Sequence, residues 1–233
     1  MEINSFFNNL EKYYATESLS NQYKVSSPIK HIIVDNFFPE EIYKNLCNDI
    51  RNYPADKWIH KNLGNTSGPR KETRDFTGSD ILQNIMLNLT GHNFISWMTK
   101  ITGVEGIIPD PHYLGAGITS TPRNSQLGLH IDFNWNNSLK LNRAFNLIIY
   151  SNPEWKSEWN GQLEFWNRSK TEKLLTVEPT PNRLIFWEYE QEFFHGFTEP
   201  ILCPEDIERQ NLMSIYYLSN STPLESPHKS VFY

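Results

Sequence analysis

Apolar positions recur with a helical period in the first hundred residues of the chain. After residues 37–41, where a proline and two acidic residues are typical of the first turn of a helix, Ile42, Leu46 and Ile50 fall on one face. A second helical pattern follows Ser79 and continues to Gly103, with apolar positions at Ile81, Ile85, Leu89, Phe94, Trp97, Met98 and Ile101. We therefore predict helical support over residues 37–103, divided at Gly91.

Beyond residue 103 the pattern changes to short apolar runs separated by turn residues. Besides a strand at 29–34, we expect strands at 113–118, 127–132, 144–151, 162–166, 174–177, 183–187, around His195 and at 212–218. Many short, evenly spaced strands are typical of a β-sandwich or jelly roll. The predicted fold is mainly β with flanking helices (α+β): a jelly-roll core over 107–220, with the helices packed outside its larger sheet.

Two stretches have weaker patterns. Residues 1–28 are polar with scattered aromatics and a weak helical pattern, and we interpret them as an N-terminal extension of a single domain that spans 29–233. Residues 55–78 contain Gly64, Gly68, Pro69 and Gly78, which indicates a long loop suited to forming part of a lid. The basic residues of this loop, Arg70, Lys71 and Arg74, are expected to be solvated.

Composition narrows the class of protein. The 233 residues contain 14% aromatics and carry a net charge of −6, which favours a folded interior and argues against nonspecific binding to nucleic acid. Only Cys47 and Cys203 are present, so we expect no disulfide framework. This cysteine content favours a cytoplasmic location. The N-terminus lacks a signal-peptide pattern, and no apolar stretch approaches the ~20 residues that span a bilayer.

The candidate chemistry begins in the stretch 127–134. His130 and Asp132 lie two positions apart in a predicted strand, so their side chains project from the same face. A second histidine from elsewhere would complete the facial triad of non-haem iron(II) oxygenases. The alternative for so short a motif is a strand histidine hydrogen-bonded to a nearby aspartate, without metal.

Two more candidate residues, His195 and Arg209, lie further along the chain. His195 is set among phenylalanines, where aromatic walls suit either an ordinary core histidine or a metal ligand shielded from solvent. Arg209 stands near the start of the last predicted strand. A guanidinium there is suited to bidentate capture of a carboxylate, although a single arginine is more often a surface residue.

The order His-x-Asp, His-Gly and Arg resembles that of the iron(II)- and 2-oxoglutarate-dependent oxygenases, specifically the prolyl-4-hydroxylase-like branch. The resemblance extends beyond the candidate ligands and spans about residues 30–220. Residues 37–41 resemble the start of a helix in this family, 146–155 and 159–166 resemble its strand, tight turn and next strand, and 182–186 resembles the strand before its second histidine. Several motifs in the correct order are more specific than any one of them.

The resemblance implies a double-stranded β-helix, a cupin-like jelly roll, with His130, Asp132 and His195 as iron(II) ligands. It also assigns Arg209 to the distal carboxylate of 2-oxoglutarate. Relatives usually carry Arg-x-Ser at this point, whereas this chain has Asn211 in place of the serine, and an asparagine amide can still donate to a carboxylate. Because Asp132 fills the position that halogenating relatives leave for chloride, hydroxylation is expected.

Further cofactor-binding residues are predicted from their position. Tyr113 and Thr121 belong to the segment before the His-x-Asp strand, where relatives line the pocket. Arg143 and Asn146 are three positions apart in one predicted strand, so regular alternation places them on opposite faces. We assign Asn146 to the cavity, because a polar residue in an otherwise apolar strand needs an explanation.

The expected reaction is hydroxylation of an unactivated C–H bond in a prolyl peptide, a free amino acid or another small metabolite. It would use iron(II), 2-oxoglutarate and O2, release succinate and CO2, and be stimulated by ascorbate. The alternative is a noncatalytic jelly-roll protein that binds, for instance, carbohydrate and requires no metal. A zinc hydrolase with the same three ligands is a third possibility, but it gives Arg209 no role.

Overall fold

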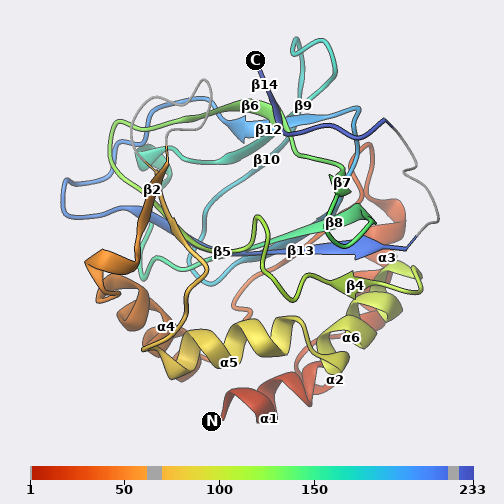
Figure 1. The fold of residues 1–233 in the computed structure, drawn as a ribbon, viewed down its shortest axis with the longest axis horizontal. Coiled ribbons are helices and arrows are strands. Elements are labelled where there is room, and N and C mark those ends of the chain that lie inside the picture. The colour runs from red at the N-terminus through yellow and green to blue at the C-terminus, as the bar shows by residue number, and fades with distance from the viewer. Residues whose placement is uncertain (1, 62–69, 220–225) are drawn as a thin grey trace.

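The computed structural model describes residues 2–61, 70–219 and 226–233 and contains two antiparallel β-sheets that face each other (Figure 1). Among these residues the larger sheet has nine strands. Seven follow the order β1 (His31–Val34), β11 (Leu184–Glu188), β8 (Leu141–Tyr150), β13 (Arg209–Leu218), β5 (Gly117–Thr121), β3 (Arg70–Thr73) and β2 (Ile59–Lys61). The other two are short: β4 (Ile108–Pro109) pairs with β13, and β7 (Trp135–Asn136) pairs with β8.

The smaller sheet lies across from it and carries most of the candidate metal ligands. Its order is β10 (Lys173–Val177), β9 (Leu163–Trp166), β12 (Phe194–Phe197), β6 (Leu127–Ile131) and β14 (Val231–Phe232). Two facing antiparallel sheets of this kind form the double-stranded β-helix that the sequence predicts, so the fold class is confirmed.

Helices cover the outer face of the larger sheet, as Figure 1 shows. They are α1 (Ile3–Phe7), α2 (Leu10–Tyr13), α3 (Thr16–Val25), α4 (Glu40–Arg51), α5 (Asp80–Leu89) and α6 (His92–Thr102), with short 3-10 turns at Ala55–Lys57 and Ser157–Trp159. The Ser79 hydroxyl accepts the backbone N–H of Leu82 and caps α5, and Gly91 separates α5 from α6 as predicted. The longer helices α4, α5 and α6 bury one apolar face, while α1 packs against α5 and α2 against α6.

The N-terminal residues pack into the same core as the rest of the chain. Phe6 and Phe7 are 0% and 1% exposed, and the Phe6 ring lies 5.5 Å from the ring of Phe37, with edge-to-face geometry. The stretch that we predicted as an N-terminal extension therefore shares one hydrophobic core with the remaining helices.

The prediction of a single long loop over residues 55–78 is wrong in part. Residues 59–61 and 70–73 pair as an antiparallel hairpin, and β3 extends the larger sheet beyond β5. Arg70 faces the space between the sheets, and Lys71 forms an ion pair with Glu208, 2.7 Å between Nζ and Oε2. Residues 62–69 of that predicted loop lie outside the described residues.

A β-bulge in β8 changes which side chains face the inside. Ile215 pairs with Asn146 and Tyr216 with Phe145, but Tyr217 pairs with Arg143, so Ala144 is the extra residue of β8. An extra residue shifts the alternation by one position. Arg143 and Asn146 consequently point to the same side of the sheet, which corrects the prediction that only one of them could face the cavity.

Both cysteines, Cys47 and Cys203, are free and buried. In the part of the chain that the structure describes, no helix has both the length and the apolar character needed to cross a membrane. The cytoplasmic location stays a prediction.

Candidate metal centre

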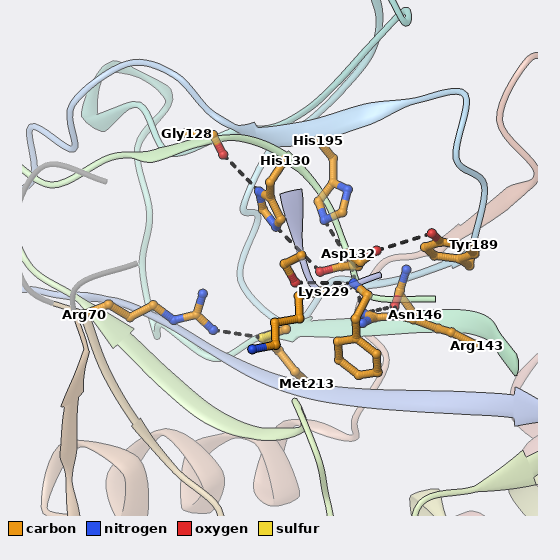
Figure 2. A network of polar contacts seen from close by, with 12 residues as sticks. Arg70, Gly128, His130, Asp132, Arg143, Asn146, Tyr189, His195, Met213 and Lys229 are labelled. Atoms are coloured by element: carbon orange, nitrogen blue, oxygen red, sulfur yellow. Dashed lines mark hydrogen bonds and ion pairs between the residues drawn. The ribbon is translucent and has the colours of Figure 1, made fainter. Parts of the chain in front are cut away.

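Three side chains from the smaller sheet and its edge converge at one end of the space between the sheets. His130 of β6 and His195 of β12 are directly opposite in the strand pairing, and Asp132 follows β6 immediately. The Nε2 atoms of His195 and His130 lie 3.3 Å and 3.6 Å from the two carboxylate oxygens of Asp132. One potential ligand atom from each residue lies within 4.8 Å of the others. Figure 2 shows the three side chains pointing toward one another.

The His130 ring is held with one nitrogen turned toward this centre. Its Nδ1 is 2.9 Å from the backbone oxygen of Gly128, so Nδ1–H donates and Nε2 keeps its electron pair. Burial, and then the charge of His195, lowers the pKa of His130 to about 3, so the ring is neutral near pH 7. The Phe232 ring of β14 stacks on the His130 imidazole, with the ring centroids 4.8 Å apart.

The carboxylate of Asp132 is kept ionised by Arg143. Burial alone would raise the pKa of Asp132, but Arg143, and then His195 and His130, outweigh burial and hold this pKa well below its ordinary value. The Arg143 guanidinium donates to Asp132 Oδ2 at 2.8 Å through Nη2. This contact fixes the orientation of the carboxylate, and an ionised carboxylate is the form that binds a metal.

Arg143 in turn is locked by its neighbours. It is 3% exposed in its side chain, its Nε donates to Asn146 Oδ1 at 2.7 Å, and its guanidinium lies 4.7 Å from the centroid of the Phe133 ring. The Oδ1 atom of Asn146 therefore accepts from Arg143, while its buried Nδ2 has no hydrogen-bond partner among the residues described. A buried amide that lacks an acceptor costs free energy, so Nδ2 is suited to donate to a ligand in the cavity.

The cavity beside the three ligands has a volume of about 250 Å³ and extends between the sheets to Arg209. Thr121 and Asn211 line this far end, and Thr121 pairs directly with Arg209 across β5 and β13. Arg209, Asn211, Thr121 and Asn146 thus border one cavity, as the sequence predicts for cofactor-binding residues.

Arg209 is a buried cation without an acidic partner in the described part of the chain. It is 4% exposed, and its Nε donates to the Gly161 backbone oxygen at 2.8 Å while Nη1 donates to Asn211 Oδ1 at 3.0 Å. Its guanidinium also lies 5.1 Å from the centroid of the Tyr150 ring. A buried charge is costly unless it is paired, so this end of the cavity suits an anionic group of a ligand.

Gly161 makes room for the arginine. Its φ is +80°, and a Cβ added there would lie 2.9 Å from Arg209 Cδ. Sequence reasoning did not identify Gly161 in this role; the Asn160-Gly161 pair indicated only a turn.

Tyr113 does not belong to the cavity. It has a φ of +52° in the turn before β5, and its ring packs on Phe76 at a centroid distance of 5.4 Å on the helix side of the larger sheet. The predicted strand at 113–118 begins instead at Gly117, and this shift accounts for the misplacement of Tyr113.

The donor set and the cavity fit a metal together with a dicarboxylate. Two imidazole nitrogens and one carboxylate oxygen would hold a metal here, and this donor set suits iron(II) and other first-row divalent metals. Arg209, which has no acidic partner in the described ranges, lies in the same cavity and matches a carboxylate in charge.

Comparison with known proteins agrees with this arrangement. Residues 116–219 match the profile of a family described as the 2OG-Fe(II) oxygenase superfamily. No curated protein matches the sequence.

Among solved structures, a prolyl hydroxylase from Trichoplax adhaerens, in complex with a peptide from the oxygen degradation domain of hypoxia inducible factor, is similar. Its TM-score is 0.63 at 16% identity, with 94% of each chain covered. A prolyl-4-hydroxylase from Pseudomonas putida gives 0.59 at 15% identity, over 86% of this chain and 99% of the other. HygX from Streptomyces hygroscopicus, with nickel, 2-oxoglutarate and hygromycin B bound, gives 0.54 at 9%, over 88% and 89%. Because these sequence identities are low, the structural similarity shows that the fold is shared and nothing more.

Proposed function

We propose that this chain is an iron(II)- and 2-oxoglutarate-dependent hydroxylase that uses His130, Asp132 and His195 as metal ligands, because residues 116–219 match the profile of the 2OG-Fe(II) oxygenase superfamily. One observation carries the proposal. The three ligand side chains converge on the same cavity that holds the buried guanidinium of Arg209, which has no acidic partner among the residues that the structure describes. A histidine and an aspartate that merely hydrogen-bond within a core would need no such cation.

When bound, iron(II) with 2-oxoglutarate and O2 supplies the oxidation of a C–H bond to an alcohol, with succinate and CO2 as the other products. The protein's own part is to bind, orient and exclude water. Arg209 binds the distal carboxylate, assisted by Thr121 and Asn211 at the same end of the cavity. Asn146 donates its Nδ2–H to a ligand oxygen nearer the metal ligands, and Arg143 keeps Asp132 ionised and oriented.

Water is excluded by the aromatic residues around the ligands. The rings of Trp187 and Phe165 lie 5.8 Å and 5.9 Å from the His195 ring, and Phe232 covers His130. Such a wall protects a reactive centre from side reactions with solvent. The presence of Asp132, which occupies one coordination position, supports hydroxyl transfer as the outcome.

The substrate class is the least constrained part of the proposal. The Trichoplax adhaerens neighbour binds a peptide and HygX binds hygromycin B, so the fold accepts both peptides and small molecules. We propose a prolyl peptide, a free amino acid or another small metabolite as the substrate of this chain.

Metal and 2-oxoglutarate binding test the proposal directly. Isothermal titration of the purified protein with Mn(II), a redox-stable substitute for iron(II), should show one site, which His130→Ala and Asp132→Ala abolish. With iron(II), ascorbate and O2, the wild-type protein should convert 2-oxoglutarate to succinate, and Arg209→Met should raise the 2-oxoglutarate KM by about 100-fold, as expected for the loss of a bidentate ion pair.

His112→Ala is the matched control, since His112 is exposed and lies in a turn away from the cavity. This variant should bind Mn(II) and form succinate like the wild type. Unchanged Mn(II) affinity in His130→Ala would contradict the proposal and favour a noncatalytic binding protein. Turnover that is independent of O2 would favour a hydrolase.

A further inference from the structure

A third guanidinium, besides those of Arg143 and Arg209, faces the cavity and has no role in the proposed chemistry. Arg70 lies on β3, where Lys71 pairs with Ser120, so Arg70 is level with Thr121 on β5. Thr121 pairs in turn with Arg209 on β13. Arg70, Thr121 and Arg209 therefore form one row across three strands, and all three line the cavity.

The partners of Arg70 within the described residues compensate its charge only in part, through a long ion pair with Glu72. Its Nε is buried without a hydrogen-bond partner, and its Nη2 contacts the Met213 sulfur at 3.5 Å, which is a weak acceptor (Figure 2). The nearest carboxylate oxygen, on Glu72, is 4.0 Å away, and Glu72 already forms an ion pair with Lys61. The Arg70 side chain is only 17% exposed. A largely desolvated guanidinium with donors unused is suited to bind an anion.

The Arg70 side chain extends from the row of Arg209 toward the metal ligands. Its guanidinium contacts Met213, whose backbone lies four residues along β13 from that of Arg209, or roughly 13 Å at about 3.3 Å per residue. The next inward residue of β13, Ile215, pairs with Asn146 beside Arg143. Burial lowers the pKa of Arg70, and the charges of both Arg209 and Asp132 also act on it, so Arg70 lies between the two ends of the cavity.

We propose that Arg70 binds a carboxylate of the substrate, so that the substrate is a small carboxylic acid, such as a free amino acid, and not an internal residue of a peptide. This inference rests on the proposed function. A carboxylate accepts two parallel N–H bonds from a guanidinium, which would use the Nε and Nη donors of Arg70. The cavity volume of about 250 Å³, which 2-oxoglutarate must share, is below the roughly 300–1,000 Å³ of pockets that hold a drug-sized ligand.

Paired probes test the need for the carboxylate. The full chain is loaded with Mn(II) and N-oxalylglycine, an unreactive analogue of 2-oxoglutarate, and titrated calorimetrically with the free L-amino acids and with their carboxamides. We expect at least one free acid to bind and its carboxamide, which lacks the negative charge, to bind roughly 10- to 100-fold more weakly.

Variants then assign the preference to Arg70. In Arg70→Gln the affinity for the free acid should fall to that of its carboxamide, with the N-oxalylglycine affinity unchanged, and Arg70→Lys should retain part of the preference. Lys71→Gln is the matched control, because Lys71 is the next residue of β3, carries the same charge and pairs with Glu208 away from the cavity. It should bind the free acid like the wild type.

Three outcomes would overturn the inference: no free acid of the panel binds, acids and carboxamides bind equally, or Arg70→Gln weakens N-oxalylglycine instead. The last result would place Arg70 in the 2-oxoglutarate site. Retained Mn(II) and N-oxalylglycine binding in Arg70→Gln also shows that the variant is folded. Failure of the proposed function would appear separately, as wild-type protein that binds neither Mn(II) nor N-oxalylglycine.

Discussion

The contact between Gly161 and Arg209 gives a prediction at the scale of single residues. In Gly161→Ala the new methyl group would press on Arg209 Cδ, 2.9 Å away, and the residue would be strained at its φ of +80°. We expect the N-oxalylglycine Kd to rise about tenfold because Arg209 is displaced, and the free energy of unfolding to fall by about 1–2 kcal/mol. Calorimetry and urea unfolding measure the two effects, and Mn(II) affinity should stay the same.

Gly106→Ala separates displacement from backbone strain. Gly106 has a similar φ of +74°, but a Cβ there would meet nothing within 4 Å. This variant should lose similar stability and keep the wild-type N-oxalylglycine affinity. If Gly161→Ala binds the analogue as tightly as Gly106→Ala does, then the position of Arg209 does not determine carboxylate binding.

Residue types and spacing were enough to predict some residues of the site but not others. His130 and Asp132 could be predicted because a two-residue spacing keeps one face of a strand, and Arg209 because its order after His195 resembled a known family. Arg143 was assigned to the wrong face because a single bulge residue, Ala144, reverses the alternation, and a bulge has no reliable signal in one sequence. Arg70 could not be predicted to line the cavity, because its strand β3 is short and polar and is stabilised by pairing with β5.

At the scale of elements, β14 is the feature with the clearest consequence. This two-residue strand pairs with β6 and places the Phe232 ring over His130, and the backbone before it is held by Asn134, whose amide donates to the Ser226 oxygen at 3.1 Å. We refer to residues 226–233 as the C-terminal segment. Its contacts close one side of the metal centre.

Phe232→Ala should therefore admit water to the metal without unfolding the domain. Bound Mn(II) relaxes the protons of water that exchanges with its coordination sphere, so the relaxation enhancement of bulk water should increase in this variant. Tyr233→Ala is the control, because the Tyr233 ring packs on Phe194, with centroids 4.9 Å apart, and not on His130. Equal enhancement in both variants would show that the C-terminal segment does not shield the metal.

The elements that the sequence predicted well are those with long, regular apolar patterns. The patterns that predicted α4, α5 and α6 and most core strands extend over enough residues for burial to impose a period. The strands β4, β7 and β14 each have two residues, so no period exists to be recognised. Tertiary pairing alone creates them, as it does β2 and β3.

For the molecule as a whole, the N-terminal helices are part of the stabilising core. The rings of Phe6, Phe7, Phe37 and Phe94 contact one another across segments far apart in the sequence. Phe6→Ala should lower the free energy of unfolding by about 3–5 kcal/mol, as for other large-to-small changes at fully buried phenylalanines. Urea unfolding measures this loss.

Leu87→Ala provides the comparison on a solvent-facing site, because Leu87 is 61% exposed on α5. Its effect should stay within about 0.5 kcal/mol. A loss below about 1 kcal/mol for Phe6→Ala would mean that residues 1–28 behave as the separate extension that the sequence suggested. The scattered aromatics of this polar stretch gave only a weak helical pattern, and so their burial could not be predicted.

The buried charge of Arg209 has a kinetic consequence for this acidic chain. A protein of net charge −6 repels anions at long range, whereas the Arg209 guanidinium in the cavity attracts them at short range. Added salt screens charges separated by more than about 8–10 Å, so the balance between the two effects decides how fast a dicarboxylate arrives. If the cavity dominates, the association rate constant of 2-oxoglutarate, followed by stopped-flow fluorescence of the cavity residue Trp187, should fall as salt is raised while its dissociation rate changes little. Arg209 would then set the speed of encounter as well as the strength of binding.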